Sequence, residues 1–367
     1  MSAVERPGIS ERWLKSVKKP GKQTSPYGAN QVATYVADLN YFVVHGRSEK
    51  HLAAKEITGH EFEPTNPPQQ GWEAYLPVDL HVYGAIRFCE FEATGINSAR
   101  WDNGLASAAF GAVRLSQVMD LHTQMLLPRR FPGKPLRIMN KKSLVYTALG
   151  LVNGDDDSAL SLARMQLAAL RTNCYAPDQP FPMSCFTARL LADYLGQAPL
   201  LIKSDPAHLL KSDIPADAVM DGLFSVWSDA DPESLRPHLL AACDIHTHQA
   251  YLGANSYRRE FGNAVWSRVP IAALLVFKLR SLRGLANIEV DHPLLSTALG
   301  RLPAGAPRIP DPLLERVLAR MRQDGFDEAE IAAHYVRQVP GQVDTQILLA
   351  YITIQNITRY QYREGSL

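Results

Sequence analysis

The chain has 367 residues, enough for two domains of ordinary size or for one large domain whose core needs no disulfide or metal support. Its 38 basic and 37 acidic residues leave a net charge of +1, and this balance argues against a dedicated nucleic-acid-binding protein. Hydrophobic residues at 46% and charged residues at 20% describe an ordinary globular chain, neither disordered nor membrane-spanning.

The first 28 residues are polar and rich in lysine, and they lack the apolar stretch of a secretory signal. The longest apolar run, Val269 to Phe277, is about half of what a bilayer span requires. We therefore expect residues 1–28 to form a solvated basic arm on a cytoplasmic protein. The four cysteines have no Cys-x-x-Cys spacing, so we expect reduced thiols and no zinc or other cofactor.

Polar segments rich in proline indicate where the main loops lie. One of them, Cys174–Pro182, separates two helical regions, residues 29–175 and 183–367, and it stays open whether these form one domain or two. The segments are Glu63–Gly71, Pro128–Pro135, Cys174–Pro182 and Pro303–Pro312.

Several helices are predicted from apolar residues at helical spacing after a capping residue. One follows Asp155 and carries a stripe of four apolar residues, Leu160, Ala163, Leu167 and Leu170. A second opens at Asp231-Pro232 and places Leu235, Leu239, Ala242, His246 and Ala250 along one side. A third, from about Val269 to Arg283, is apolar on almost every side, which predicts a buried helix that stops at Gly284.

The clearest supersecondary unit is an αα-hairpin that begins at Asp311-Pro312. Its second helix is predicted from a capping pair, Asp327 and Glu330, and from a hydrophobic staple, Phe326 and Ile331. Residues 343–363 fit a helix and a strand equally well. The predicted fold is therefore mainly α: a multi-helix globular bundle or an irregular array of αα-hairpins, with little or no β structure.

The string Asp244, His246 and His248 resembles the metal-binding strand of amidohydrolase-like barrels, in which two histidines project from one side of a strand. That geometry requires an extended chain, since only there do residues i and i+2 share a face. Two helical steps rotate a side chain by about 200°, and the preceding segment reads as a helix. A structural histidine pair near a helix end is therefore the favoured interpretation, and a metal site is the alternative.

Three adjacent carboxylates, Asp155, Asp156 and Asp157, form the second candidate site. Acidic residues at a helix N-terminus are stabilised by the helix dipole without any function. The three residues lack the glycine and distal glutamate of a calcium loop, so the functional alternative is contact with a basic partner. We find no catalytic motif of the nucleophile-elbow, phosphate-loop or dinucleotide-binding kind.

Residues 270–303 combine the predicted buried helix, which ends in LRGL at 282–285, with DHPLL at 291–295 and GRLP at 300–303. This segment resembles a late segment of bacterial immunity-type proteins, helical proteins that neutralise toxins delivered between competing cells, including those of type VI secretion systems. A structural account also fits: Asp291 can cap a short helix that carries Leu294, Leu295 and Leu299.

Three hypotheses follow for the function. The first, implied by the resemblance, is a non-enzymatic cytoplasmic binding protein, an immunity protein that binds and blocks a co-encoded toxin without membrane or nucleic-acid contact and with a homodimer left open. The second is a metal-dependent hydrolase that uses Asp244, His246 and His248 with further ligands such as His208 or His238. The third is a structural or assembly protein of a secretion or phage-like machine.

Overall fold

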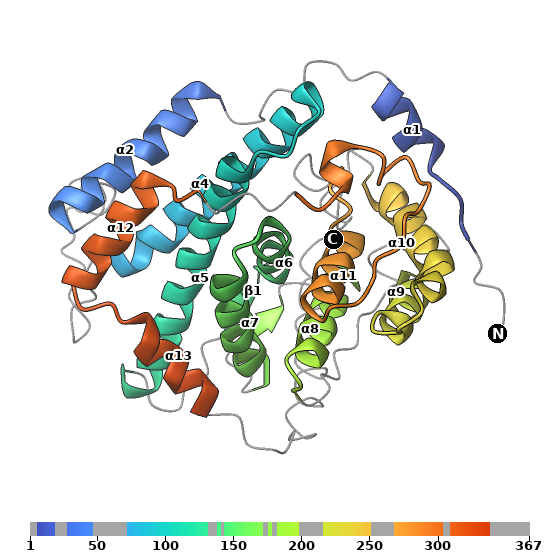
Figure 1. Ribbon diagram of the computed structural model, residues 1–367. Helices are drawn as coiled ribbons and strands as arrows, with labels where there is room; N and C mark the ends of the chain where they lie inside the picture. The colour runs from blue at the N-terminus through green and yellow to red at the C-terminus, as the bar shows by residue number, and fades with distance from the viewer. Residues whose placement is uncertain are drawn as a thin grey trace, which may run out of the picture.

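The structure is a computed structural model, and helices dominate it (Figure 1). It describes residues 6–18, 28–46, 72–130, 138–140, 143–171, 175–177, 182–197, 216–250, 268–303 and 309–337. The prediction of a mainly α fold is confirmed. The segment 343–363, for which helix and strand were equally favoured, lies outside the described residues.

The α-helices are α1 (Glu11–Lys18), α2 (Ala29–His45), α4 (Trp72–Ser98), α5 (Asn103–Arg130), α6 (Ser143–Asn153), α7 (Asp156–Arg171), α8 (Pro182–Tyr194), α9 (Ala216–Val226), α10 (Arg236–Gln249), α11 (Ile271–Leu282), α12 (Pro312–Gln323) and α13 (Glu328–Arg337). Two short 3₁₀ helices are η2 (Pro232–Leu235) and η4 (Ala298–Gly300). The strands β1 (Ile138–Asn140) and β2 (Tyr175–Pro177) pair in parallel.

Two of the predicted loops differ from the structure. The segment Cys174–Pro182 includes strand β2, which pairs with β1 because α6 and α7 supply the long crossover that a parallel pair needs. The segment Pro128–Pro135 begins inside α5, which continues to Arg130. A proline so near the end of a helix removes a single backbone hydrogen bond, and tertiary packing of a long helix offsets that loss.

The two longest helices, α4 and α5, pack side by side along their length. Gly84 of α4 lies close to the backbone of α5: a Cβ atom there would stand 2.9 Å from the carbonyl oxygen of Ala109 and 2.6 Å from a methyl carbon of Val113. Close approach of this kind requires a residue without a side chain, so the glycine sets the spacing of the hairpin.

Helices from both predicted regions share one hydrophobic core. The α11 helix packs against α6 and α8, α13 packs against α5 and α7, and α12 packs against α2 and α5. In Figure 1, α2 and α12 lie at one side of the molecule and α9 and α10 at the opposite side. The buried apolar residues between them form one continuous cluster.

The predicted helix caps are present. Asp231 accepts a hydrogen bond from the amide of Glu233, and Asp311 accepts from two amides at the start of α12. Asp327 does the same for α13, and the staple residues Phe326 and Ile331 are both buried. The predicted αα-hairpin is therefore the pair α12 and α13.

Helix α11 carries an arginine with no exposed surface, Arg280. Its guanidinium donates to the carbonyl oxygens of Trp227 and Asp229 at 2.8 Å and to that of Ala286 at 2.6 and 3.0 Å. Burial lowers the pKa of Arg280 below its ordinary value. Since all of these partners are backbone carbonyls, this cation fastens the ends of α9 and α11 together.

The N-terminal residues contradict the prediction of a solvated arm as far as residues 6–18 are concerned. Trp13 of α1 is buried, and the amide of Ser10 donates to the hydroxyl of Thr247 at 2.9 Å. The His248 ring nitrogen Nε2 lies 3.0 Å from the carbonyl oxygen of Gly8. Trp13 and Leu14 give α1 an apolar side that packs against the core, which the lysine-rich composition of residues 1–28 did not indicate. We call residues 6–18 the N-terminal strap.

Among the described helices, none combines the length and the hydropathy that crossing a bilayer demands.

Candidate functional site

The first of the three predicted contact residues, Asp155, is buried in a polar network. Its carboxylate accepts hydrogen bonds from the hydroxyl of Ser107 at 3.2 Å and from the side-chain amide of Asn153 at 3.1 Å. Asn153 also accepts from the indole of Trp101 at 2.8 Å. The network ties α5 to the turn between α6 and α7, where Gly154 adopts a positive φ of 92°. Asp155 is thus a structural acceptor inside the protein.

The other two acidic residues differ in their exposure. Asp156 pairs with Lys278 of α11 at 2.9 Å, and both side chains are largely covered. Asp157 is exposed in the first turn of α7. The structure therefore leaves one of the three predicted contact residues, Asp157, open to a partner.

The geometry required for the metal hypothesis is contradicted by the structure. Asp244, His246 and His248 all lie on helix α10, where the residues two positions apart point in different directions. Asp244 and His246 are buried, whereas His248 is partly exposed and reaches the N-terminal strap. Within the described ranges, no group of three histidine, cysteine or acidic side chains is placed to hold a metal ion. Of the two proposed further ligands, His208 lies outside those ranges, and His238 packs against Gly222 of α9.

Asp244 is instead a buried carboxylate that pairs with Arg6 and His292. Its Oδ2 accepts from Arg6 Nε at 3.1 Å, and its Oδ1 lies 3.2 Å from His292 Nε2. The amide of Leu294 donates to His292 Nδ1 at 3.1 Å, so the neutral ring carries its proton on Nε2 and donates it to Asp244. Burial lowers the pKa of His292, although the hydrogen bond to Asp244 acts in the opposite direction. The lowered pKa favours the neutral ring, and Arg6 is then the counter-ion of Asp244.

An aspartate that orients a histidine is also a feature of hydrolytic triads. The pair of Asp244 and His292 lacks a further feature of such triads, a histidine nitrogen that is free to accept a proton. A catalytic base needs a ring nitrogen that is free to take a proton from a nucleophile. In His292 both nitrogens are occupied, one by Asp244 and the other by the amide of Leu294. The neighbouring thiol of Cys243 is fully buried, and this burial raises its pKa to about 12. The arrangement supports packing and does not assemble a nucleophile.

The helix predicted after Asp291, with Asp291 as its cap, does not form as predicted. The chain makes turns over residues 293–297 and then the 3₁₀ helix η4. The acceptor for the free amide of Leu294 is the His292 ring rather than the Asp291 carboxylate. Because the ring is at the same time held by Asp244, the buried histidine outcompetes the exposed aspartate as the capping group.

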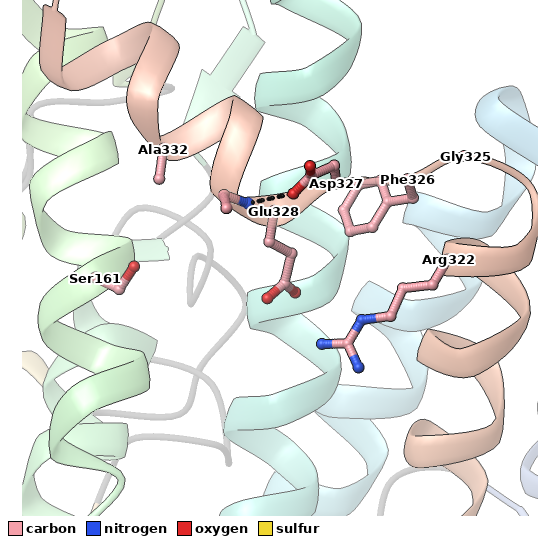
Figure 2. A pocket seen from close by; sticks show the side chains of 8 residues that line it. Ser161, Arg322, Gly325, Phe326, Asp327, Glu328 and Ala332 are labelled. Atoms are coloured by element: carbon pink, nitrogen blue, oxygen red, sulfur yellow. Dashed lines mark hydrogen bonds between the residues drawn. The ribbon is translucent and has the colours of Figure 1, made fainter.

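The remaining candidate is a hollow of about 840 Å³ between α7 and the α12–α13 hairpin (Figure 2). Its walls come from Ser161 of α7, from Arg322 in the last turn of α12, and from the turn and first part of α13. The residues of that last wall are Gly325, Phe326, Asp327, Glu328, Ala329 and Ala332. Phe326 is fixed beneath the turn, edge-on to the ring of His122 of α5.

The charged residues of the hollow are not equally available. Asp327 accepts from the amides of Ala329 and Glu330 at 2.8 and 3.2 Å, and Glu328 pairs with Arg114 of α5 at 3.0 Å. Arg322 is exposed, and its guanidinium extends into the hollow (Figure 2). Among the described residues, no hydrogen bond or ion pair engages the Arg322 side chain. Among the described residues, the side chain of Arg322 therefore has no partner, whereas the carboxylates of Asp327 and Glu328 already accept hydrogen bonds.

The exposed side of α7 continues this surface. Asp157, Ser161 and Arg164 follow one another at spacings of four and three residues, so they lie along one face of the helix. Asp157 and Arg164 are both exposed. The predicted contact residue Asp157 thus lies one helical turn from the wall of the hollow.

Sequence reasoning missed the hollow because its residues come from separate elements. Arg322 was predicted only as part of a helix, and Asp327 only as a cap. The αα-hairpin was the feature of the sequence from which the hollow could have been predicted. Its tight turn, Asp324-Gly325, places the last turn of α12 beside the first turn of α13.

No protein-family model, no curated protein and no solved structure matches this chain.

Proposed function

We propose that this chain is a binding protein that blocks a protein partner, specifically an immunity protein that neutralises a co-encoded bacterial toxin in the cytoplasm. The observation that carries the proposal is the open hollow between α7 and the α12–α13 hairpin, where packed helices present charged side chains. Rigid helical walls lower the entropic cost of binding, since little of the surface has to be ordered on association.

The other polar clusters support this proposal in a different way. Asp155, Asp244 and His292 each have their hydrogen-bonding capacity used within the fold, so the motifs that suggested chemistry stabilise the protein. A surface role is then left to the exposed residues around the hollow, with Asp157 as the member that the sequence already indicated.

The test is to express the product of a neighbouring gene alone and together with this chain. A toxin–immunity pair predicts growth arrest in the first case, growth in the second, and a stoichiometric complex by size-exclusion chromatography. Purification of the tagged chain without any such protein, under conditions in which the neighbouring genes are expressed, would contradict the proposal.

The residue-level part of the proposal concerns Asp157. The Asp157→Lys variant is expected to change both the affinity for the toxin and the salt dependence of association, because a charge at the rim steers the encounter. Glu289→Lys, an exposed reversal on the loop between α11 and η4, is the matched control. Equal affinities and salt slopes for the two variants would remove Asp157 from the interface.

A role as an assembly component of a secretion or phage-like machine predicts a different behaviour. Light scattering would then detect large particles of the purified chain, whereas a toxin-binding protein is expected to remain a monomer or dimer.

A further inference from the structure

The N-terminal strap is held by one face of α10. It contacts Asp244, Thr247 and His248, which share a face because they lie three and four positions apart on that helix. The side chain of Arg6 is 42% exposed, whereas that of Asp244, its ion-pair partner, has no exposed surface. A segment near the end of a chain can detach without unfolding the elements behind it. Opening of the strap is therefore expected to cost less free energy than unfolding of the whole molecule.

Asp244 lies between two side chains that can act as its counter-ion. Its Oδ2 accepts from Arg6 Nε at 3.1 Å, and its Oδ1 lies 3.2 Å from His292 Nε2. An arginine always carries its charge, whereas a histidine becomes charged only when it takes up a proton. When the strap opens, Arg6 leaves, and a buried carboxylate without a counter-ion is strongly destabilising.

We propose that the strap is a proton-linked latch: when Arg6 leaves Asp244, His292 takes up a proton and replaces Arg6 as the counter-ion. Within the described residues, three charged groups act on the His292 ring, namely Asp244 of α10, Arg6 of the strap and Asp291 of its own loop. Burial is the largest cause that lowers the pKa of His292, and Arg6 lowers it further, whereas Asp244 and Asp291 raise it. Departure of Arg6 therefore raises the pKa of His292.

The direction of the pH dependence follows from the number of protons bound. Between the lower pKa of His292 in the closed form and its higher pKa in the open form, opening takes up a proton, so a falling pH favours the open strap. The added proton resides on Nδ1, to which the amide of Leu294 donates at 3.1 Å. That hydrogen bond is lost on protonation whether the strap is closed or open, so its loss leaves the direction unchanged. His248 does not reverse it either, because its Nε2 can donate to the carbonyl of Gly8 in both protonation states.

The first experiment measures hydrogen–deuterium exchange of residues 6–18 in the full chain from pH 7.5 to pH 5.5, corrected for the intrinsic pH dependence of exchange. In the wild type we expect the protection of these amides to fall by up to about 10-fold per pH unit between the two pKa values. His292→Asn keeps an acceptor for the amide of Leu294 and is expected to lose this pH dependence. His238→Asn is the matched control, because His238 also has a pKa lowered by burial but does not contact Asp244; it should behave like the wild type. Exchange of the buried helix α11 in the same samples reports opening of the whole molecule.

The second experiment measures the pKa of His292 by NMR titration in the wild type and in Arg6→Gln. We expect a higher pKa in the variant, with the other histidines unchanged, and this comparison decides the matter if His292→Asn does not fold. Equal pKa values with and without Arg6, or the same pH dependence of strap protection in the wild type and His292→Asn, would overturn the latch. Neither measurement requires a partner protein, so the latch stands or fails separately from the proposed function.

Discussion

At the scale of single residues, Asp244 shows how a charge that suggested chemistry serves the fold. It has no exposed surface, and its counter-ion, Arg6, reaches it from 238 residues earlier in the chain. A buried carboxylate that loses its partner is strongly destabilising, because its desolvation is no longer compensated. The ion pair therefore contributes to stability mainly through the penalty that follows when it is broken.

The first prediction concerns this pair. Arg6→Ala is expected to lower the free energy of unfolding by about 1–3 kcal/mol, the range for hydrogen bonds to a charged group, since Arg6 itself is partly exposed. Arg6→Lys keeps the charge but loses the paired hydrogen bonds that the guanidinium donates to Oδ2 and Oδ1 of Asp244, at 3.1 and 3.4 Å, so its effect should be intermediate. Urea unfolding measures both, with Lys15→Ala on the exposed side of α1 as a control expected within about 0.5 kcal/mol of wild type.

The second prediction is the pH dependence that His292 imposes. Its pKa is lowered in the folded state, so between that pKa and the ordinary value of about 6.5 the unfolded chain binds more protons. Stability should therefore fall as the pH decreases below about 6.5 and should stop falling below the folded pKa. His292→Asn keeps an acceptor for the amide of Leu294 and removes the titration, so its unfolding free energy should vary less over this range.

His238 is a second histidine with a pKa lowered by burial, and it contributes in the same direction. The informative quantity is thus the difference between wild type and His292→Asn at each pH. A constant difference from pH 7.5 to pH 5 would show that His292 does not titrate in this way.

Single residues also show why part of the site escaped prediction. The caps Asp231, Asp311 and Asp327 could be predicted because a cap and its amides are neighbours in sequence. Both partners of Asp244 and one partner of Asp155, Ser107, are distant in sequence, and a periodic pattern carries no information about distant contacts. A structural role was one of the two interpretations of Asp155–Asp157 and of the string Asp244, His246 and His248. The residues that they contact became known only from the structure.

At the scale of elements, the spacing of apolar residues, together with capping residues, predicted α7, α10, α11, α12 and α13, although the helix expected from Asp231 starts as the 3₁₀ helix η2 and continues as α10 only from Arg236. It failed for α1, because a short helix among lysines has too few apolar residues to be recognised without its neighbour. It also gave no indication of β1 and β2, since three-residue strands lie below the length at which alternation can be detected.

The third prediction is argued from the packing of α4 and α5. Gly84→Ala places a Cβ atom against the Ala109 carbonyl, so the helices must separate, and a loss of about 1–3 kcal/mol is expected. Gly104→Ala is the matched variant, because its Cβ atom would meet only ordinary contacts in the first turn of α5. Thermal unfolding of the two variants should show a marked loss for Gly84→Ala and little change or a slight gain for Gly104→Ala. Equal effects would mean that the close approach does not constrain the hairpin.

At the scale of the whole molecule, one core joins the two regions that the proline-rich segments appeared to separate. The α11 helix packs against both α6 and α8, and α13 packs against α5 and α7. Each region alone would expose a large apolar surface that the other now covers.

The fourth prediction follows from this shared core. A protease site inserted between Pro177 and Pro182 is expected to give two fragments that stay associated on size-exclusion chromatography after cleavage. Urea unfolding of the uncleaved chain should give coincident transitions by tryptophan fluorescence and by far-UV circular dichroism. Two fragments that elute separately and remain folded would instead define two domains.

The N-terminal strap has a consequence for how the protein is made. Arg6 is synthesised 238 residues before Asp244, its partner on α10. At about 5–20 residues per second, this leaves an interval on the order of 10 to 50 s. During that interval the guanidinium of Arg6 lacks its native partner, and residues 6–18 are accessible to chaperones. The strap therefore reaches its native position only after α10 has been synthesised, which places its docking late in the folding of the chain.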